Sequence, residues 1–176
     1  TLNVDGLNEY PLSTAERMEY ILTQLLASTP DVIALQEVVG PMEAVLRRRL
    51  AGWRIYRRHA VTEKDYNMTA MRTAAASAAD RTTTSLFPTS NQGRHLVTVR
   101  RSKWAIVNVH AESGRRAVER DERAVQLRHM SRMHEHSEGE TFVLVGDFNV
   151  REGNDHCLCT EGWRDAWREA PAVAAG

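Results

Sequence analysis

The stretch that decides the fold is residues 141–151, which read TFVLVGDFNVR. Its first part, residues 141–145, is short, β-branched and aromatic, which predicts a buried strand that Gly146 then ends. Asp147 and Asn149 follow directly. Because ligands of helix-covered sheets bind beyond the carboxyl ends of strands, this placement favours a functional site.

Asp147 and Asn149 are two positions apart, so an extended backbone would direct both side chains to the same side. A carboxylate beside an amide can bind a phosphate ester together with a hard cation or a water molecule. An Asx turn that merely closes the strand is the alternative. The stretch by itself leaves both interpretations open.

The composition is that of one ordinary globular domain: 176 residues, 42% hydrophobic and 26% charged. No window approaches the roughly 18 to 20 uninterrupted apolar residues of a membrane span, so we expect no membrane partner. Cys157 and Cys159 are too close in sequence for an ordinary structural disulfide. They indicate free thiols in a reducing compartment and an intracellular location, nuclear or cytoplasmic.

The 23 basic and 23 acidic residues balance, so bulk charge does not predict a nucleic-acid-binding protein. All the basic residues except Lys64 and Lys103 are arginines. Arginine suits bidentate phosphate contacts, but a GC-rich genome also explains such a bias. The charge pattern therefore leaves the ligand open.

Strand and helix patterns alternate irregularly, which predicts an α/β domain with mixed sheets. Further strands are expected over residues 1–5, 31–36, 53–58, 66–74, 82–87, 95–100 and 103–110, the last two forming a hairpin. Helices are expected over residues 14–29, 41–50, 116–134 and 163–170. The apolar stripe of the third helix would comprise Ala117, Val118, Ala124, Val125, Leu127 and Met130.

Polar clusters end or edge four of the predicted strands. They are Asn3 with Asp5, Glu37, His110 with Glu112 and Ser113, and Asp147 with Asn149. Taken singly, each cluster has a purely structural explanation. The residues could form an Asx turn, a solvated or helix-capping glutamate, or a histidine whose hydrogen bonds are satisfied at a strand end. Four strands with polar residues at comparable positions favour a shared site.

These motifs resemble those of the endonuclease/exonuclease/phosphatase superfamily of metal-dependent phosphodiesterases. The matching segments are residues 1–7 (TLNVDGL), 35–38 (LQEV), 110–114 (HAESG) and 146–151 (GDFNVR), with Glu119, Arg120 and Gln126 in the helix that follows His110. The H-x-E-S and G-D-x-N-x-R patterns indicate the branch of 5′-tyrosyl-DNA phosphodiesterases. The resemblance covers nearly the whole chain and implies a DNase I-like fold, a four-layered α/β sandwich of two mixed β-sheets flanked by helices.

The resemblance also implies a role for each matching residue. Glu37 would hold Mg²⁺, with Mn²⁺ as a possible substitute, and Asp147 would orient and activate the attacking water. The residues implied to position or contact the phosphate are Asn3, His110, Ser113, Asn149 and Arg151, with Tyr66 and Arg115 as substrate-binding residues and Asp5 and Glu112 as hydrogen-bonding supports. The implied reaction, part of DNA repair, is in-line hydrolysis of the bond between a DNA 5′ end and a tyrosyl or similar adduct.

The superfamily also has a late Asp-His motif whose histidine contacts the scissile phosphate. His156 follows Asp147 too closely to be that histidine, and residues 162–167 (GWRDAW) resemble the segment before the motif. We therefore expect residues 1–176 to be one incomplete domain, truncated at both ends, with little activity by itself.

Two alternatives remain at this level. One keeps the chemistry but changes the substrate to abasic DNA, RNA, or a phospholipid or inositol phosphate. The other is a catalytically dead relative that serves as a scaffold. Four intact polar groups at one predicted site argue against this alternative, because a scaffold has no need of them. The oligomeric state does not follow from the sequence.

Overall fold

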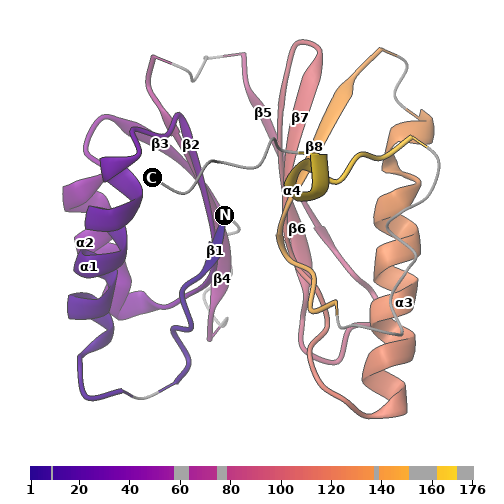
Figure 1. Ribbon diagram of the computed structural model, residues 1–176, viewed down its shortest axis with the longest axis horizontal. Helices are drawn as coiled ribbons and strands as arrows, with labels where there is room; N and C mark the ends of the chain where they lie inside the picture. Colours follow the sequence, from indigo (N-terminus) through magenta and orange to yellow (C-terminus); the bar gives the residue numbers. More distant parts are fainter. Residues whose placement is uncertain (9, 58–63, 75–78, 137–138, 151–161, 170–176) are drawn as a thin grey trace.

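The computed structural model describes residues 1–8, 10–57, 64–74, 79–136, 139–150 and 162–169 (Figure 1). Two four-stranded sheets face each other, with strand orders β1-β2-β4-β3 and β5-β6-β7-β8. The first sheet contains β1 (Leu2–Asn3), β2 (Val32–Val38), β4 (Tyr66–Arg72) and β3 (Trp53–Arg57). The second contains β5 (Arg81–Leu86), β6 (His95–Arg101), β7 (Trp104–His110) and β8 (Thr141–Asp147).

Helices cover the outer face of each sheet. In Figure 1, α1 (Thr14–Ala27) and α2 (Glu43–Arg49) lie against the first sheet, and α3 (Ala117–Ser131) lies against the second. The 3-10 helices η1 (Gly40–Met42) and η2 (Met133–His136) adjoin α2 and α3, and α4 (Ala166–Glu169) is the last element in the described part of the chain. The predicted four-layered α/β sandwich of two mixed sheets is therefore confirmed.

Apolar side chains form three clusters, one for each boundary between layers. The cluster under α1 and α2 includes Met18, Leu22, Leu35 and Leu46, and the cluster under α3 includes Leu96, Val107, Leu127 and Met130. Tyr56, Met71, Val97 and Val99 pack between the two sheets. Burying each large side chain contributes about 1.5–3 kcal/mol, so these boundaries hold the layers together.

Asn108 ties the two sheets together through a buried polar network. Its amide nitrogen donates to the carbonyl oxygens of Leu35 (3.2 Å) and Met68 (2.9 Å) across the interface. Its amide oxygen accepts a 2.7 Å hydrogen bond from Nε2 of Gln36. Because buried polar groups are costly unless paired, this network fixes how β2 and β4 lie over β7.

The expectation of a buried strand over residues 141–145 is wrong in one respect. The strand forms, but Thr141 is exposed and Val143 is 44% exposed. Within the described residues β8 is an edge strand of its sheet and pairs only with β7. An apolar run can therefore form a strand without being covered on both faces.

Gly146 does not end the strand, contrary to the sequence prediction. It pairs with Val109 inside the parallel β7–β8 ladder, and the strand continues to Asp147. Its φ of 143° is rarely adopted by other residues, and a Cβ here would overlap the carbonyl oxygen of Val109. Glycine is thus required for the close approach that brings Asp147 beside β7.

Gly146→Ala is expected to lower the free energy of unfolding by about 2–4 kcal/mol, because backbone must move to accommodate the methyl group. Urea denaturation measures the change. Gly40→Ala is the matched control, since a Cβ at Gly40 meets nothing within 4 Å. Equal stability of the two variants would contradict the close approach at Gly146.

Helix α3 forms where it was expected, over Ala117–Ser131, but its buried face shares only Leu127 and Met130 with the predicted stripe. Val118 and Val125 of the predicted apolar stripe are 52% and 47% exposed. The buried residues of this helix are Glu119, Glu122, Arg123, Gln126, Leu127, Met130 and Ser131. This face is largely polar because it binds the backbone that follows β7, as described below.

The final predicted helix, residues 163–170, is shorter in the structure, where α4 spans Ala166–Glu169. Trp163 instead donates its indole N–H to the carbonyl oxygen of Ser131, at 2.8 Å. Cys157 and Cys159, from which a reducing compartment was inferred, lie outside the described residues. Of the helices in the described residues, none is long and apolar enough to cross a membrane.

Candidate active site

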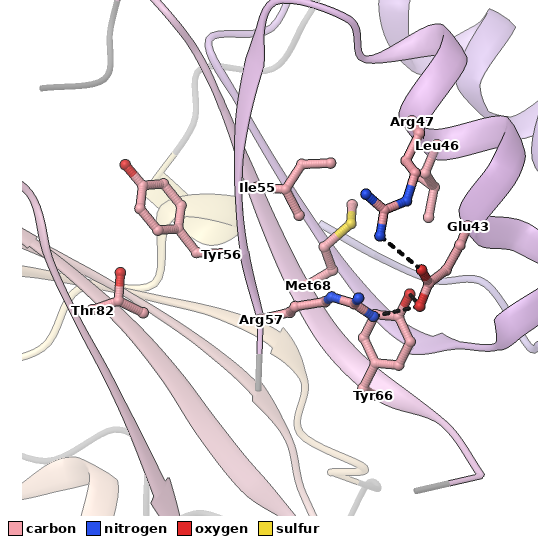
Figure 2. Close-up of a pocket in the computed structure, with 9 residues that line it drawn as sticks. All are labelled: Glu43, Leu46, Arg47, Ile55, Tyr56, Arg57, Tyr66, Met68 and Thr82. Atoms are coloured by element: carbon pink, nitrogen blue, oxygen red, sulfur yellow. Dashed lines mark hydrogen bonds and ion pairs between the residues drawn. The ribbon is translucent and has the colours of Figure 1, made fainter. Parts of the chain in front are cut away.

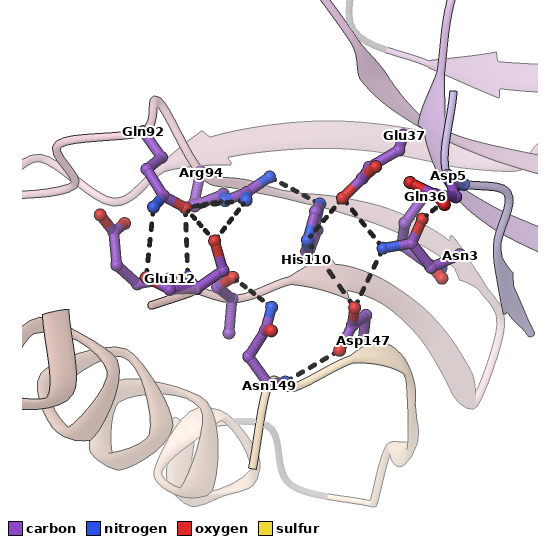
Figure 3. A network of polar contacts seen from close by, with 12 residues as sticks. Asn3, Asp5, Gln36, Glu37, Gln92, Arg94, His110, Glu112, Asp147 and Asn149 are labelled. Carbon is purple, nitrogen blue, oxygen red and sulfur yellow. Dashed lines mark hydrogen bonds and ion pairs between the residues drawn. The ribbon is translucent and has the colours of Figure 1, made fainter. Parts of the chain in front are cut away.

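The strand topology brings the four polar clusters together. In the parallel β7–β8 pair, His110 lies opposite Asp147, and in the parallel β1–β2 pair, Asn3 lies opposite Gln36, the neighbour of Glu37. Parallel strands end at the same edge of a sheet. Since the sheets pack face to face, their polar strand ends meet in one centre, shown in Figure 3.

The amide of Asn3 joins the two sheets at this centre. Its nitrogen donates to Oε1 of Glu37 at 3.1 Å and to Oδ2 of Asp147 at 3.0 Å. One amide therefore orients both carboxylates, although Asn3 and Asp147 are 144 positions apart in the sequence. This arrangement supports the predicted grouping of Asn3, Glu37 and Asp147.

Glu37 occupies a β-bulge near the end of β2. The register with β4 shifts between Leu35 and Val38, and Glu37 has a φ of 57°. This strained conformation aims the carboxylate at the centre, and such strain is common at functional sites. Burial raises the pKa of Glu37, and the hydrogen bond from Asn3 opposes the rise.

The segment Asp147-Phe148-Asn149 is not extended, so the extended geometry assumed in the sequence prediction does not set the direction of its two polar side chains. Oδ1 of Asp147 accepts a 2.9 Å hydrogen bond from the Asn149 backbone N–H, and Asn149 has a φ of 51°. The amide of Asn149 donates to the carbonyl oxygen of Ala111 at 3.0 Å. The Asx turn and the polar centre are thus both present, and the turn positions the second oxygen of Asp147 for Asn3.

Asp5 supports Asn3 through its backbone. Its N–H donates to Oδ1 of Asn3 at 2.9 Å, which sets the orientation of the Asn3 amide. The Asp5 side chain does not share a face with Asn3, because Asp5 has a φ of 51° and its carboxylate binds Asn8 and Tyr10. The supporting role predicted for Asp5 therefore has a geometric basis in its N–H.

His110 is buried and contacts both carboxylates of the centre. Its Nε2 lies 3.5 Å from Oε1 of Glu37 and 3.8 Å from Oδ2 of Asp147. Its Nδ1 lies 2.6 Å from Nη1 of Arg94. Because a guanidinium can only donate, Nδ1 must accept, which places the proton of the neutral ring on Nε2, facing the carboxylates.

Burial and the charge of Arg94 lower the pKa of His110 to about 4. Between pH 6.5 and about 4 the unfolded chain therefore binds a proton at this position that the folded chain does not. The free energy of unfolding is expected to fall as the pH decreases through this window. Urea denaturation of the wild type and of His110→Asn, without divalent ions, measures the difference, and identical pH dependence would contradict it.

Arg94 is the principal site residue that the sequence analysis missed. It is 9% exposed and lies between His110, Gln92 and Ser113, with Nη1 also 3.9 Å from Oδ2 of Asp65. It directly precedes β6, whereas the predicted site residues lie where strands end. An arginine-rich composition offers no signal that distinguishes this one.

Glu112, predicted to support the site by hydrogen bonding, lies in a buried hydrogen-bond network with Ser90 and helix α3. Oε2 of Glu112 accepts from Ser90 at 2.6 Å and from Gln126 at 3.4 Å, and its backbone N–H donates to Gln126 at 2.7 Å. Arg123 donates to the Glu112 carbonyl oxygen at 3.0 Å. The polar face of α3 therefore holds the turn that carries Ser113.

Tyr66 lies in a separate environment from the polar centre. Its hydroxyl donates to Glu43 at 3.1 Å, the Arg57 guanidinium lies 4.9 Å from its ring centre, and burial raises its pKa. It lines a pocket of about 420 Å³ at the edge strand β3 (Figure 2). The pocket is also lined by Leu46, Arg47, Ile55, Tyr56, Met68 and Thr82.

The two arginines predicted to contact substrate have no contact with the centre among the described residues. Arg115 is exposed just before α3, and Arg151 lies outside the described residues. Of the other predicted residues, Asn3, Glu37, His110 and Asp147 meet directly. Ser113 joins them through Arg94, whose Nη2 lies 3.4 Å from the Ser113 hydroxyl.

The donor set suits a hard divalent cation that keeps its own water ligands. The described residues contain no group of three or more His, Cys, Asp or Glu side chains arranged to hold a metal ion. Structural and catalytic zinc sites need three or four such ligands, whereas Mg²⁺ is usually bound by one or two carboxylates with waters and phosphate. Glu37, with Asp147 beside it, fits the second pattern.

Face-to-face mixed sheets, outer helices and an acidic centre at four strand ends define a DNase I-like α/β sandwich. The model of the endonuclease/exonuclease/phosphatase family matches residues 1–175. The chain belongs to this family.

Relatives within the family cover much of the chain. Tyrosyl-DNA phosphodiesterase 2 of Homo sapiens is 30% identical over 157 residues, 86% of this chain and 41% of the relative. The chain thus spans about two fifths of the length of the curated relatives it matches. These relatives belong to the branch that the HAESG and GDFNVR motifs indicate.

Solved structures agree with the fold. A humanised D. rerio TDP2 with 14 mutations has a TM-score of 0.79 and 24% identity, covering 95% of this chain and 69% of that one. D. rerio TDP2 complexed with a single-strand DNA product has a TM-score of 0.71 and 25% identity, covering 85% of this chain and 59% of that one.

Proposed function

We propose that the protein containing this chain is a divalent-metal-dependent phosphodiesterase of DNA repair, acting on a DNA 5′ end that carries a tyrosyl or similar adduct. The observation that carries the proposal is the Asn3 amide, which binds Glu37 and Asp147 at once beside the buried His110. The similarity to tyrosyl-DNA phosphodiesterase 2, and the DNA product bound by one such relative, support the substrate. A nuclear or cytoplasmic location is part of the proposal.

Mg²⁺ held by Glu37, with Mn²⁺ as a substitute, would supply neutralisation of phosphate charge and stabilisation of the leaving oxygen. Asp147 is the proposed acceptor of a proton from the attacking water, because its Oδ2 faces the centre and is oriented by Asn3. Asn149 holds the turn that fixes Asp147, through its bond to Ala111.

His110, Arg94 and Ser113 are the proposed donors to the phosphate oxygens. The Nε2–H of His110 faces the centre as a neutral donor, so it can bind an oxyanion without giving up a proton. Arg94 carries the positive charge next to it. We retain Arg115, Arg151 and Tyr66 as proposed substrate contacts on the grounds of the resemblance alone.

The test compares substrates with the full-length gene product in Mg²⁺. Release of free tyrosine from a 5′-tyrosyl oligonucleotide is expected, at a rate well above cleavage of an abasic duplex, RNA or an inositol phosphate. Asp147→Asn is the control variant and should remove turnover of every substrate tested. Preferred cleavage of another substrate would assign a different reaction of the same family, and no turnover with any would refute the proposed activity.

A further inference from the structure

Four hydrogen-bond donors converge on a single oxygen, Oε1 of Gln92. Arg94 donates through Nε at 3.0 Å and Nη2 at 2.8 Å. Ser113 donates through its backbone N–H at 3.1 Å and its hydroxyl at 2.9 Å. We call the groups that these two residues contribute the Arg94–Ser113 donor cluster.

The donor cluster offers more hydrogen bonds than one neutral amide oxygen can accept. A carbonyl oxygen has two lone pairs, so four donors share it imperfectly. One of the two contributing side chains is a cation, and charge-assisted hydrogen bonds to an anionic oxygen are about twice as strong as neutral ones. The cluster is therefore better matched to an oxyanion than to Gln92.

The occupant and its donors differ in how firmly they are held. Gln92 is exposed and lies in the segment between β5 and β6, and its own amide nitrogen makes one 3.2 Å bond to the Ser113 carbonyl oxygen. Arg94, in contrast, is buried and bound to His110, and the backbone around Ser113 is held by α3. Gln92 can thus rotate into water while the donors stay in place.

We propose that Gln92 Oε1 occupies the Arg94–Ser113 donor cluster in the free protein, in the place of a phosphate oxygen of the substrate, and that this oxygen displaces Gln92 on binding. The inference rests on the proposed function for the identity of the natural ligand, a phosphate ester. It adds that the protein carries its own competitor for that ligand.

Competition gives opposite effects for two substitutions of Gln92. Gln92→Met has a similar length but only a weak acceptor in its thioether sulfur, so it should free the cluster and tighten phosphate binding by about 3-fold to 10-fold. Gln92→Glu places a carboxylate on Arg94, so it should weaken phosphate binding by at least roughly 10-fold. Asn91→Asp is the matched control, because it adds the same charge at the exposed neighbouring position.

The experiment titrates inorganic phosphate into each variant, with a chelator present so that no divalent ion binds the anion. The chemical shift of the Ser113 backbone N–H in ¹H–¹⁵N spectra reports on the cluster itself and yields the dissociation constant. Thermal unfolding checks that each variant is folded. The expected order of affinity is Gln92→Met, wild type, then Gln92→Glu, with Asn91→Asp close to wild type.

Other results would overturn the proposal. If both Gln92 variants bind phosphate more weakly than wild type, Gln92 holds the donors in place and is no competitor. If phosphate leaves the Ser113 N–H unmoved in all variants, the cluster is no anion subsite. If Asn91→Asp weakens binding as much as Gln92→Glu, the effect is general repulsion.

This readout is independent of turnover. A protein that follows the expected phosphate series but releases no tyrosine from the 5′-tyrosyl oligonucleotide retains the subsite and refutes the proposed reaction. Turnover without the phosphate series refutes the subsite alone.

Discussion

Glu37→Gln is expected to remove divalent-metal binding at the polar centre and to lower kcat/KM by roughly 1,000-fold, since a bound metal supplies several kcal/mol of charge stabilisation. The substitution keeps the size of the side chain and its acceptor for the Asn3 amide. Because burial disfavours the charged form of Glu37, the neutral amide should leave the unfolding temperature unchanged or raise it.

Binding and turnover are measured separately for this variant. Mn²⁺ titration followed by electron paramagnetic resonance reports the metal affinity of the chain, and the full-length gene product reports kcat/KM. Glu135→Gln, which removes an exposed carboxylate from η2, is the control and should match the wild type in both. Wild-type metal affinity in Glu37→Gln would exclude Glu37 as the ligand.

The hydrophobic pattern predicted most strands and helices because burial and strand formation depend on local sequence. Strands β2, β6 and β7 and helix α1 lie close to their predicted positions. The pattern could not predict that β8 lies at an edge or that Gly146 continues it, because both depend on which strand lies alongside. Sheet order is a long-range property that short periodicities do not encode.

The candidate site was predicted in part for a similar reason. Polar residues at strand ends are visible in sequence, so Asn3, Glu37, His110 and Asp147 could be grouped before their contacts were known. Arg94 and Gln92 were missed because they lie before a strand, and their importance comes only from contacts with His110 and Ser113.

Helix α3 illustrates how a site can override a hydrophobic pattern. Its valines suggested one buried face, but the helix turns Gln126 and Arg123 inward to satisfy the backbone after β7. Leaving those backbone groups unpaired in a buried position would cost about 1–3 kcal/mol each, comparable to the gain from burying a valine. The need to pair these buried backbone groups therefore decides which face of the helix is buried.

The second large effect is expected from Arg94→Met in the full-length gene product, which should lower kcat/KM by roughly 100-fold to 1,000-fold, the usual cost of losing one preorganised donor to developing charge. Burial is the main cause of the low pKa of His110 and the charge of Arg94 is the second, so removing that charge should raise the pKa above about 4 while burial still holds it below its usual range. Nδ1 of His110 would lose its only donor among the described residues.

Arg94→Lys separates charge from geometry. Lysine keeps the positive charge but lacks the planar fork that reaches Gln92 and His110 together, so it should hold the His110 pKa low while restoring little turnover. The ¹⁵N shifts of the His110 ring measure its pKa and its tautomer, and Arg128→Met on the exposed side of α3 is the control. An unchanged His110 pKa in Arg94→Met, or full activity in Arg94→Lys, would show that the guanidinium contact to Nδ1 does not set the state of this histidine.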